Sequence, residues 1–394
     1  MKHRRFGRTE LEMPLISFGC MRFQTSWERG AKVTKESQAN LERIVAHALA
    51  LGINHFETAR GYGTSEEQLG RVLPHLDRKQ IILQTKVKPY PNEKDFVRDV
   101  RDSIKTLNVD CLDLLAVHGL NNNKLVDAAL APNGTVAAMQ KLREDGLVRH
   151  IGFSSHAGPD VITRAVESDA FDYMNLWYTY IYQDNLRAIK EAHARDMGVF
   201  VISPNDKGGK LYAPPHKLVR LTQPLSPMQF NDLFILAQPE IQTIPCGAAQ
   251  PADFDPHVEA VTRAAEHAAD VKRIAAGLDA ELAAVLGADW ATHYRDGLPR
   301  WHETPGQINI ATVLWLWNLA RAFDMTDYAR MRYNLLGNGS HWFPGEKADK
   351  LNEVEPAELQ KVLAESPFAD RIPDILREAD AMLAGEEVRR LGRD

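Results

Sequence analysis

The chain has 394 residues, which is long for a single hydrophobic core, so a large domain and a smaller one are expected. Its formal net charge is −6, and charges of both signs are mixed along the sequence, which argues against nucleic acid and anionic membranes as partners. Three widely spaced cysteines, at positions 20, 111 and 246, argue against a disulfide framework or a cysteine metal site.

No segment indicates export or membrane insertion. The basic residues 1–5 lack the apolar run of a secretory signal, and no uninterrupted apolar stretch is long enough to span a bilayer. The most apolar run, residues 311–320, contains Thr312 and Asn318 and is better explained as a buried helix. Together with the few cysteines, this predicts a cytoplasmic protein with no membrane partner, and it leaves the oligomeric state open.

Strands and helices alternate through the first 270 residues. Residues 4–12 predict a short hairpin, and residues 15–19 predict a first buried strand. Seven helices then each precede a strand, and a final helix over 254–269 ends the series. The helices cover 35–51, 65–73, 94–107, 135–144, 159–167, 185–195 and 226–237. The strands that follow them cover 53–57, 81–86, 112–117, 148–153, 173–177, 199–203 and 241–245.

This alternation predicts an α/β fold with parallel strands and right-handed crossovers. Eight strand–helix units in about 270 residues favour a closed (β/α)8 TIM barrel over an open doubly wound sheet. The strands are short and nearly all apolar, as strands buried on both faces are. No glycine fingerprint follows the first strand, which weakens the alternative of an open dinucleotide-binding sheet.

After residue 270 the strands stop. Helices are predicted over 276–286, 311–323, 327–335, 356–363 and 372–384, with no strand between them. The expected organisation is therefore a barrel over residues 1–270 and an all-helical C-terminal extension over residues 271–394. The tryptophans of this extension are expected to serve packing rather than chemistry.

Four residues capable of proton chemistry follow predicted strands. Glu57 ends the second strand, Tyr62 lies just before the next helix, Lys86 ends the third strand and His118 follows the fourth. In a TIM barrel the carboxyl ends of the strands share one rim, so these side chains are expected to meet. A lysine cation can lower the pKa of a neighbouring tyrosine, a carboxylate can hold the lysine, and a histidine can bind a substrate oxygen.

Each of these residues also has a structural explanation. A tyrosine after a strand is usually a surface or core residue, a Lys–Glu pair is often only a salt bridge, and a histidine at a strand end is often structural. Taken singly, the structural explanation is favoured for each. Taken together on one rim, the four residues favour a reaction in which a carbonyl oxygen gains or loses a proton.

Other strand ends could hold a nucleotide. Hydroxyl and amide side chains that could bind a carboxamide, or could merely cap a helix or satisfy backbone, are Ser154, Ser155 and Asn175. A loop with glycines and lysines that could bind a pyrophosphate, or could be a surface turn, contains Ser203, Asn205, Lys207, Gly208 and Gly209. The last strand leads to a helix N-terminus, where phosphates bind readily, through Cys246, Gly247 and Ala248. Further candidate cofactor contacts follow the first strand at Gly19, Cys20 and Met21.

The run from Phe56 to Gly63, together with Lys86, His118, residues 152–155 and residues 244–245, resembles the aldo-keto reductases over about residues 4–265. The resemblance implies a barrel that binds NADPH or NADH and interconverts carbonyls and alcohols without a metal. It implies that Tyr62 is the general acid, Lys86 tunes its pKa, His118 orients the carbonyl and the carboxylate at position 57 pairs with the lysine. It also implies that Ser154, Ser155 and Asn175 hold the nicotinamide amide.

Three departures from the family pattern affect these expectations. The family usually has aspartate where Glu57 stands, so the arm that reaches the lysine is one methylene longer. Ile202 stands where an aromatic residue commonly stacks on the nicotinamide. Residues 246–257 contain no lysine or arginine to bind a 2′-phosphate and contain Asp253 and Asp255 instead. An acid there would repel a phosphate and could accept hydroxyls from a bare ribose, which favours NADH over NADPH.

The tail has a second resemblance, to the branch of this family that carries a C-terminal ferredoxin-like domain with iron–sulfur clusters. Residues 304–310 and 337–345 lie where cluster segments would be, but no cysteine follows Cys246. Because iron–sulfur clusters need thiolates, we expect a degenerate ferredoxin-like extension without a cluster. No metal site is expected elsewhere either, because no ligand motif is present.

The sequence favours an NAD(P)-dependent oxidoreductase that acts on a small carbonyl or sugar-like substrate. Candidate substrate contacts are Arg22, His118 and Trp177, with core packing an equal explanation for the aromatic residue. Two alternatives use the same site: a redox-neutral epimerase with a retained cofactor, and a non-catalytic nucleotide-binding protein. Net consumption of NADH or NADPH distinguishes the oxidoreductase from the epimerase. A Tyr62→Phe variant with unchanged behaviour would favour the non-catalytic protein.

Overall fold

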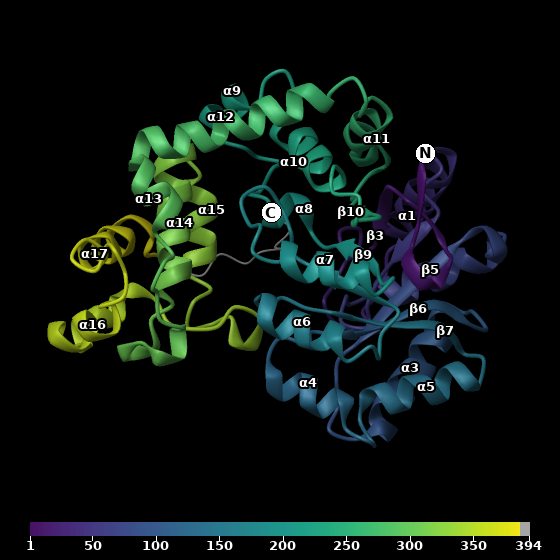
Figure 1. Ribbon diagram of the computed structural model, residues 1–394. Helices are drawn as coiled ribbons and strands as arrows, with labels where there is room; N and C mark the ends of the chain where they lie inside the picture. The colour runs from purple at the N-terminus through teal and green to yellow at the C-terminus, as the bar shows by residue number, and fades with distance from the viewer. Residues whose placement is uncertain (387–394) are drawn as a thin grey trace. The chain divides into compact units, whose positions relative to one another are not determined.

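The computed structural model describes residues 1–386, which form two compact units (Figure 1). The first unit comprises Met1–Gly208 and Asn231–His267, and the second comprises Gly209–Phe230 and the described residues from Ala268 onward. The division therefore falls inside helix α10 (Pro227–Leu236) as well as near residue 268. The expected domains 1–270 and 271–394 differ from these units in residues 209–230 and 268–270, and the domain boundary stays a prediction.

The first unit is a barrel of eight parallel strands in the order β10-β3-β4-β5-β6-β7-β8-β9. A parallel bridge between Phe200 and Thr243 joins the two ends of this order and closes the sheet. The predicted TIM barrel is thus confirmed. The strands are β3 (Ile16–Gly19), β4 (His55–Glu57), β5 (Ile82–Val87), β6 (Leu112–His118), β7 (Val148–Ser154), β8 (Tyr173–Leu176), β9 (Gly198–Val201) and β10 (Ile244–Cys246).

The predicted hairpin forms an antiparallel pair, β1 (His3–Arg5) and β2 (Glu12–Pro14), with a 3-10 turn between them. Arg4 donates from its guanidinium to backbone carbonyls that precede β10, including Leu236 O at 2.8 Å. Phe6 and Met13 join a buried cluster with residues of the barrel interior. The hairpin therefore closes the barrel at the amino ends of the strands and leaves the carboxyl ends for a site.

Helices surround the barrel and lie in the segments that follow its strands (Figure 1). Thr34 and Asn92 cap the N-termini of α1 and α3 through their side chains, as these residue types do. Two of these helices, α4 and α8, lie in segments where none was predicted. The helices are α1 (Lys35–Ala50), α2 (Ser65–Val72), α3 (Glu93–Leu107), α4 (Asn123–Leu130), α5 (Thr135–Glu144), α6 (Pro159–Glu167), α7 (Leu186–Ala194), α8 (Pro204–Lys207) and α11 (Asp255–Thr262).

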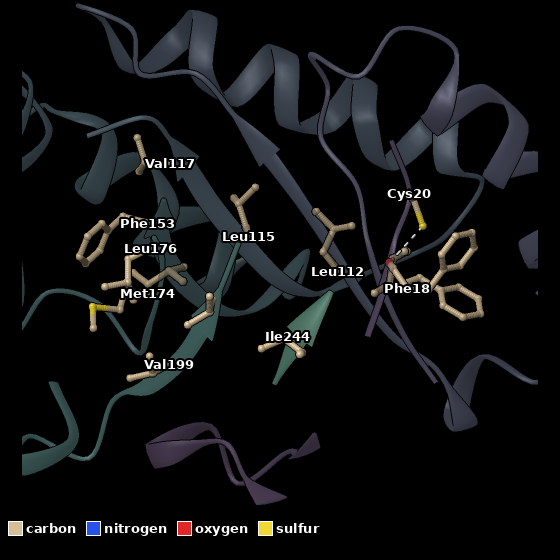
Figure 2. Packing of buried hydrophobic residues seen from close by; sticks show 14 of the residues in the cluster. Phe18, Cys20, Leu112, Leu115, Val117, Phe153, Met174, Leu176, Val199 and Ile244 are labelled. Atoms are coloured by element: carbon tan, nitrogen blue, oxygen red, sulfur yellow. Dashed lines mark hydrogen bonds between the residues drawn. The ribbon is translucent and has the colours of Figure 1, made fainter. Parts of the chain in front are cut away.

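The strands are buried on both faces, which explains their apolar sequences. On β6, Leu114 and Ala116 belong to the cluster inside the barrel, whereas Leu115 and Val117 belong to the larger cluster between strands and helices. Figure 2 shows part of the larger cluster, with side chains from β3, β6, β7, β8, β9 and β10. This period of two is that of a strand with two packed faces.

The second unit is built from helices, and its described part has no strand beyond an isolated bridge between Ile308 and Glu346. Trp290 is 1% exposed, donates from its indole to Asn318 Oδ1 at 2.8 Å, and lies 4.5 Å from the guanidinium of Arg371. This tryptophan therefore serves packing. The helices are α9 (His216–Leu221), α12 (Ala268–Leu286), α13 (Ala288–His293), α14 (Ile310–Phe323), α15 (Thr326–Tyr333), α16 (Pro356–Val362) and α17 (Ile372–Leu383). A ferredoxin-like origin of this unit stays a prediction.

Within residues 1–386 there is no helix whose length and apolar character would allow it to cross a membrane.

Candidate active site

A buried ion pair lies at the carboxyl ends of β4 and β5. Glu57 is the last residue of β4 and pairs in register with Gln84, so Lys86 lies two residues further along the neighbouring strand. The Lys86 ammonium contacts the Glu57 carboxylate and donates to Thr58 O at 3.0 Å. The two side chains are 2% and 7% exposed, so this pair is held almost entirely away from water.

Tyr62 and His118 complete the group that the sequence predicted. The Nζ atom of Lys86 lies 4.6 Å from the centroid of the Tyr62 ring. The rings of Tyr62 and His118 meet edge to face, with centroids 5.8 Å apart. The structure thus brings together four residues from β4, the turn after it, β5 and the end of β6.

Burial controls the protonation of this group. It raises the pKa of the Tyr62 phenol above its ordinary value, and the neighbouring Cys20 adds to that shift. Burial, and then the charge of Lys86, lowers the pKa of His118 to about 3, so this imidazole is neutral at physiological pH. Burial lowers the pKa of Lys86 to about 7, while contact with Glu57 favours the charged ammonium and acts in the opposite direction.

The expected lowering of the Tyr62 pKa is therefore not found in the free chain. The Lys86–Glu57 pair carries little net charge, so it stabilises a phenolate far less than an isolated lysine would. Loss of water around the phenol dominates instead. Tyr62 is consequently a neutral phenol at physiological pH, which makes its hydroxyl a proton donor.

Among the residues predicted to bind a carboxamide, Asn175 has the most hydrogen-bonding capacity left for a ligand. It is paired in register with Ser154 on β7, it is fully buried, and neither atom of its side-chain amide has a hydrogen-bond partner. Ser154 accepts from Gly119 N at 3.2 Å through its hydroxyl. Ser155 is occupied structurally, because its hydroxyl donates to Leu120 O at 2.6 Å and accepts from Ala157 N at 3.1 Å. Asn175 therefore offers the strongest unmet hydrogen-bonding capacity.

The residues after β3 border the ion pair and the last loop. Gly19 pairs in register with Glu57, and the buried Cys20 donates its backbone N–H to Glu57 O at 2.8 Å. Met21 is half-buried. A side chain at Gly247 would meet the aliphatic stem of Arg22, so these two segments lie in close contact.

The loop after β9 carries the predicted pyrophosphate contacts, which stay a prediction. Ser203 has a left-handed φ of 49°, and the short helix α8 follows it. Lys207 is 2% exposed, and its Nζ lies 2.5 Å from His156 Nδ1 and 5.3 Å from the Trp177 ring centroid. Asn205 contacts the ring of His257. Lys207 is thus a buried lysine beside two rings, Gly208 caps α8, and Gly209 belongs to the second unit.

Trp177, the predicted substrate contact at the end of β8, is also largely buried. Its ring stacks on that of Tyr182 with centroids 4.0 Å apart and an angle of 12°. The backbone carbonyl of Trp177 accepts from the Asn185 amide at 2.9 Å.

In the loop after β10, the Asp253 carboxylate binds backbone amides at a helix N-terminus. Asp253 Oδ2 accepts from Ala249 N at 2.7 Å and from Gln250 N at 3.1 Å. Cys246 donates its thiol to Asp253 O at 3.3 Å, and Ala248 is fully buried. The amides that would bind an anion there already bind the Asp253 carboxylate.

The family model for the aldo/keto reductase family matches residues 15–213, just over half of the chain. The chain belongs to this family. An aldo-keto reductase from Mycobacterium sp. (strain KMS) is 38% identical over 133 residues, which are 32% of this chain and 45% of the relative. L-galactose dehydrogenase from Arabidopsis thaliana is 29% identical over 160 residues, 38% of this chain and 47% of the relative. The matches thus span about half the length of these curated relatives.

Solved structures agree with this family assignment at the level of the fold. The holo form of an aldo-keto reductase from Bacillus halodurans superposes with a TM-score of 0.58 at 24% identity, over 70% of this chain and 96% of that one. The feature shared with that structure is the barrel fold.

Two buried ion pairs of this aldo/keto reductase were not predicted from the sequence. His257 contacts Asp232 through Nδ1 in a buried ion pair; burial disfavours its charge, but the carboxylate outweighs burial and raises the pKa of His257. Glu66 is fully buried and pairs with Arg29 at 2.7 Å. Both pairs join residues far apart in the sequence, so no local pattern marks them. Within residues 1–386, no three His, Cys, Asp or Glu side chains gather in a way that could hold a metal ion.

Proposed function

We propose that this chain is an NAD(P)(H)-dependent oxidoreductase that interconverts a carbonyl and an alcohol, with Tyr62 as the general acid and base. The observation that supports the proposal best is the Lys86–Glu57 ion pair, held 4.6 Å from the Tyr62 ring and next to His118. Such a group suits proton transfer at an oxygen atom, and the burial of its two charges costs desolvation.

The residues fit a nicotinamide cofactor. Asn175 has an amide with both hydrogen-bonding atoms unsatisfied in a fully buried position, and a carboxamide is the group that matches a free donor and a free acceptor together. Bound NAD(P)H would supply the hydride that adds to the carbonyl carbon. Asn175 and Ser154 would bind its carboxamide, and the loops after β3, β9 and β10 would hold the remainder.

Tyr62 would donate its proton to the substrate oxygen in the reducing direction and take it back in the oxidising direction. Because burial keeps the phenol neutral, the proton is present when reduction begins. His118 is neutral, so it can donate one hydrogen bond to the same oxygen without adding a charge. Lys86 would favour the phenolate once it forms, and Glu57 keeps the lysine in place.

The cofactor form is proposed to be NADH. The Asp253 carboxylate accepts hydrogen bonds from the backbone amides of the loop after β10. A 2′-phosphate approaching there would therefore meet a negative charge. For the substrate we propose a small carbonyl or sugar-like molecule, with Arg22, His118 and Trp177 as candidate contacts. A relative acts on L-galactose by its name, which makes sugars and their oxidised forms the first compounds to try.

The test measures oxidation of NADH and of NADPH with a panel of aldehydes, ketones and sugars, and compares Tyr62→Phe with Tyr173→Phe. Tyr173 is a fully buried barrel tyrosine whose hydroxyl has no hydrogen-bond partner, so it controls for loss of a buried hydroxyl. We expect turnover to be lost in Tyr62→Phe only, with nucleotide binding retained. Nucleotide binding without net oxidation would favour the epimerase, and indifference to Tyr62→Phe would favour a non-catalytic protein.

A further inference from the structure

The turn that carries Tyr62 is bound along one side to the loop after β3. Thr64 N donates to Ser26 O at 3.1 Å, and Thr25 N donates to the Thr64 hydroxyl at 3.2 Å. Gly63 has a φ of +53°, and any side chain there would collide with the Ser26 carbonyl oxygen. The backbone on the C-terminal side of Tyr62 is therefore packed directly on residues 25–26.

A buried carboxylate fastens the same two segments to β5. Glu66, in the first turn of α2, is fully buried and accepts from Thr85 Oγ1 at 2.7 Å and from Ser103 Oγ at 3.0 Å. Its third partner is the Arg29 guanidinium at 2.7 Å, which comes from the loop after β3. Thr85 is the residue before Lys86. Glu66 therefore joins the helix after Tyr62, the strand of Lys86 and the loop after β3.

The other side of the turn is held by the same network. Arg60 donates its backbone N–H to Lys86 O at 3.0 Å, and its guanidinium lies 2.6 Å from Asp102 and 3.1 Å from Asp99. Arg29 reaches this side as well, since it donates to Arg60 O at 3.3 Å and to Asp102 at 3.3 Å. One arginine therefore contacts the chain on both sides of Tyr62.

We infer that Arg29 and Glu66 are positioning residues, which hold the Tyr62 turn over Lys86 and His118 through an ion pair that touches none of these three. The inference rests on the proposed function of Tyr62. Removing Arg29 leaves the fully buried Glu66 carboxylate without its counter-charge and frees the loop after β3 from Arg60 O. The turn then loses its fixed place, and a displacement of about 1 Å can cost a large factor in the rate of a positioned reaction.

The chain offers a matched control at the opposite end of the barrel. Arg78 pairs with Asp113 at 2.6 Å near the amino ends of β5 and β6, with side-chain exposures of 29% and 2%. Arg29 and Glu66 have side-chain exposures of 28% and 0%. Arg29→Met and Arg78→Met thus remove ion pairs of similar exposure, one beside Tyr62 and one far along the strands from it. Asp113 keeps a second partner in Arg78→Met, because Arg149 also pairs with it at 2.8 Å.

The experiment measures kcat, KM and nucleotide Kd for the full chain and for Arg29→Met, Arg29→Lys and Arg78→Met. We expect kcat of Arg29→Met to fall by about tenfold or more with nucleotide Kd unchanged, whereas Arg78→Met keeps kcat. Arg29→Lys should recover part of the rate, because an ammonium can still pair with Glu66. Equal kcat in Arg29→Met and Arg78→Met would overturn the inference.

A second measurement separates this inference from the proposed function. Hydrogen–deuterium exchange of residues 58–66 should rise in Arg29→Met and in Glu66→Gln, and should stay unchanged in Arg78→Met. This readout needs no substrate. It therefore tests whether Arg29 and Glu66 hold the Tyr62 turn in place, even if the wild-type chain reduces no carbonyl and the proposed function fails. Unchanged exchange in any folded variant of Arg29 or Glu66 would contradict the positioning role of this ion pair, and it would leave the proposed function intact.

Discussion

The ammonium of Lys86 contacts the carboxylate of Glu57 inside the barrel, where the two side chains are 2% and 7% exposed. Two charges in such a place are expensive to desolvate, and each is tolerable only because the other is present. The glutamate arm is longer than the aspartate that the family usually places there, yet it reaches the lysine directly. The pair therefore fixes the position of Lys86 under the Tyr62 ring.

The first prediction concerns stability. Glu57→Gln leaves Lys86 buried without a counter-charge, so we expect the free energy of unfolding to fall by about 3–5 kcal/mol, the usual cost of breaking a buried pair. Glu57→Asp keeps the charge and should lose less. Urea unfolding, followed by the near-ultraviolet circular dichroism of the full chain, measures both variants.

The double variant Glu57→Gln/Lys86→Met is the control for the first prediction. It removes both charges, so it should be more stable than Glu57→Gln alone although it carries one more substitution. A double variant that is no more stable than Glu57→Gln would mean that the unpaired charge is not the cause.

The second prediction concerns protonation of histidines. The pKa of His118 is lowered to about 3 by burial and by Lys86, whereas that of His257 is raised by Asp232 against the effect of burial. Between about pH 5 and pH 8 we therefore expect His118 to stay neutral, and we expect His257 to keep its proton to a higher pH than an ordinary histidine. Nitrogen-15 spectra of histidine-labelled protein, assigned with His118→Asn and His257→Asn, check this; a His118 signal that titrates near its ordinary pKa would contradict it.

The same shift predicts how stability depends on pH. In the unfolded chain a histidine takes up a proton below about pH 6.5, but His118 in the folded chain does not until about pH 3. The unfolded state thus binds more protons in this window, and the free energy of unfolding falls as the pH falls through it. His118→Asn should show a shallower fall than the wild-type chain in denaturant titrations at several pH values.

Much of the site could be predicted because its residues follow strands. The carboxyl ends of parallel strands share one rim, so Glu57, Lys86 and His118 were expected to meet, and they do. The pKa of Tyr62 could not be predicted, because its direction depends on how much water the folded barrel excludes. The Glu66–Arg29 pair was not predicted either, because the helix dipole alone already explains an acid in the first turn of a helix.

Two local features of the structure were not predicted, and each has an identifiable cause. Helix α4 was missed because its start, at Asn122 and Asn123, resembles a polar loop, although Asn122 caps the helix by accepting from Leu125 N at 2.9 Å. The capping role of Asp253 was not predicted, and its predicted contact with the cofactor stays a prediction. The spacing of Gln250 and Asp253 is that of a capping box, which the sequence already contained.

The third prediction concerns Asp253 and the choice of cofactor. Asp253→Asn removes the negative charge but keeps an oxygen that can accept from Ala249 N and Gln250 N, so the loop should keep its shape. We expect binding of NADPH to improve several-fold relative to NADH, because a phosphate no longer meets a carboxylate. Asp255→Asn is the control, since that acid pairs with His47 at 2.8 Å and not with the loop amides. Equal effects of the two substitutions would assign the change to net charge alone.

The last prediction separates stability from binding at Asn175. Its amide is fully buried with no partner, so it costs the fold desolvation and returns no hydrogen bond. Asn175→Leu, of similar size, should therefore leave the free energy of unfolding unchanged or raise it, while it raises the Kd of NADH by about tenfold, or about 1.4 kcal/mol. Fluorescence titration with NADH and urea unfolding of the same samples measure the two quantities.

Asn185 shows what an ordinary buried asparagine should do in the same experiment. It is 1% exposed and donates to Trp177 O at 2.9 Å, so Asn185→Leu removes a buried hydrogen bond and should cost about 1 kcal/mol of stability. A fold that loses as much from Asn175→Leu as from Asn185→Leu would show that Asn175 serves the barrel itself. The opposite pattern, a stable variant that no longer binds NADH tightly, would assign the unsatisfied amide to the cofactor.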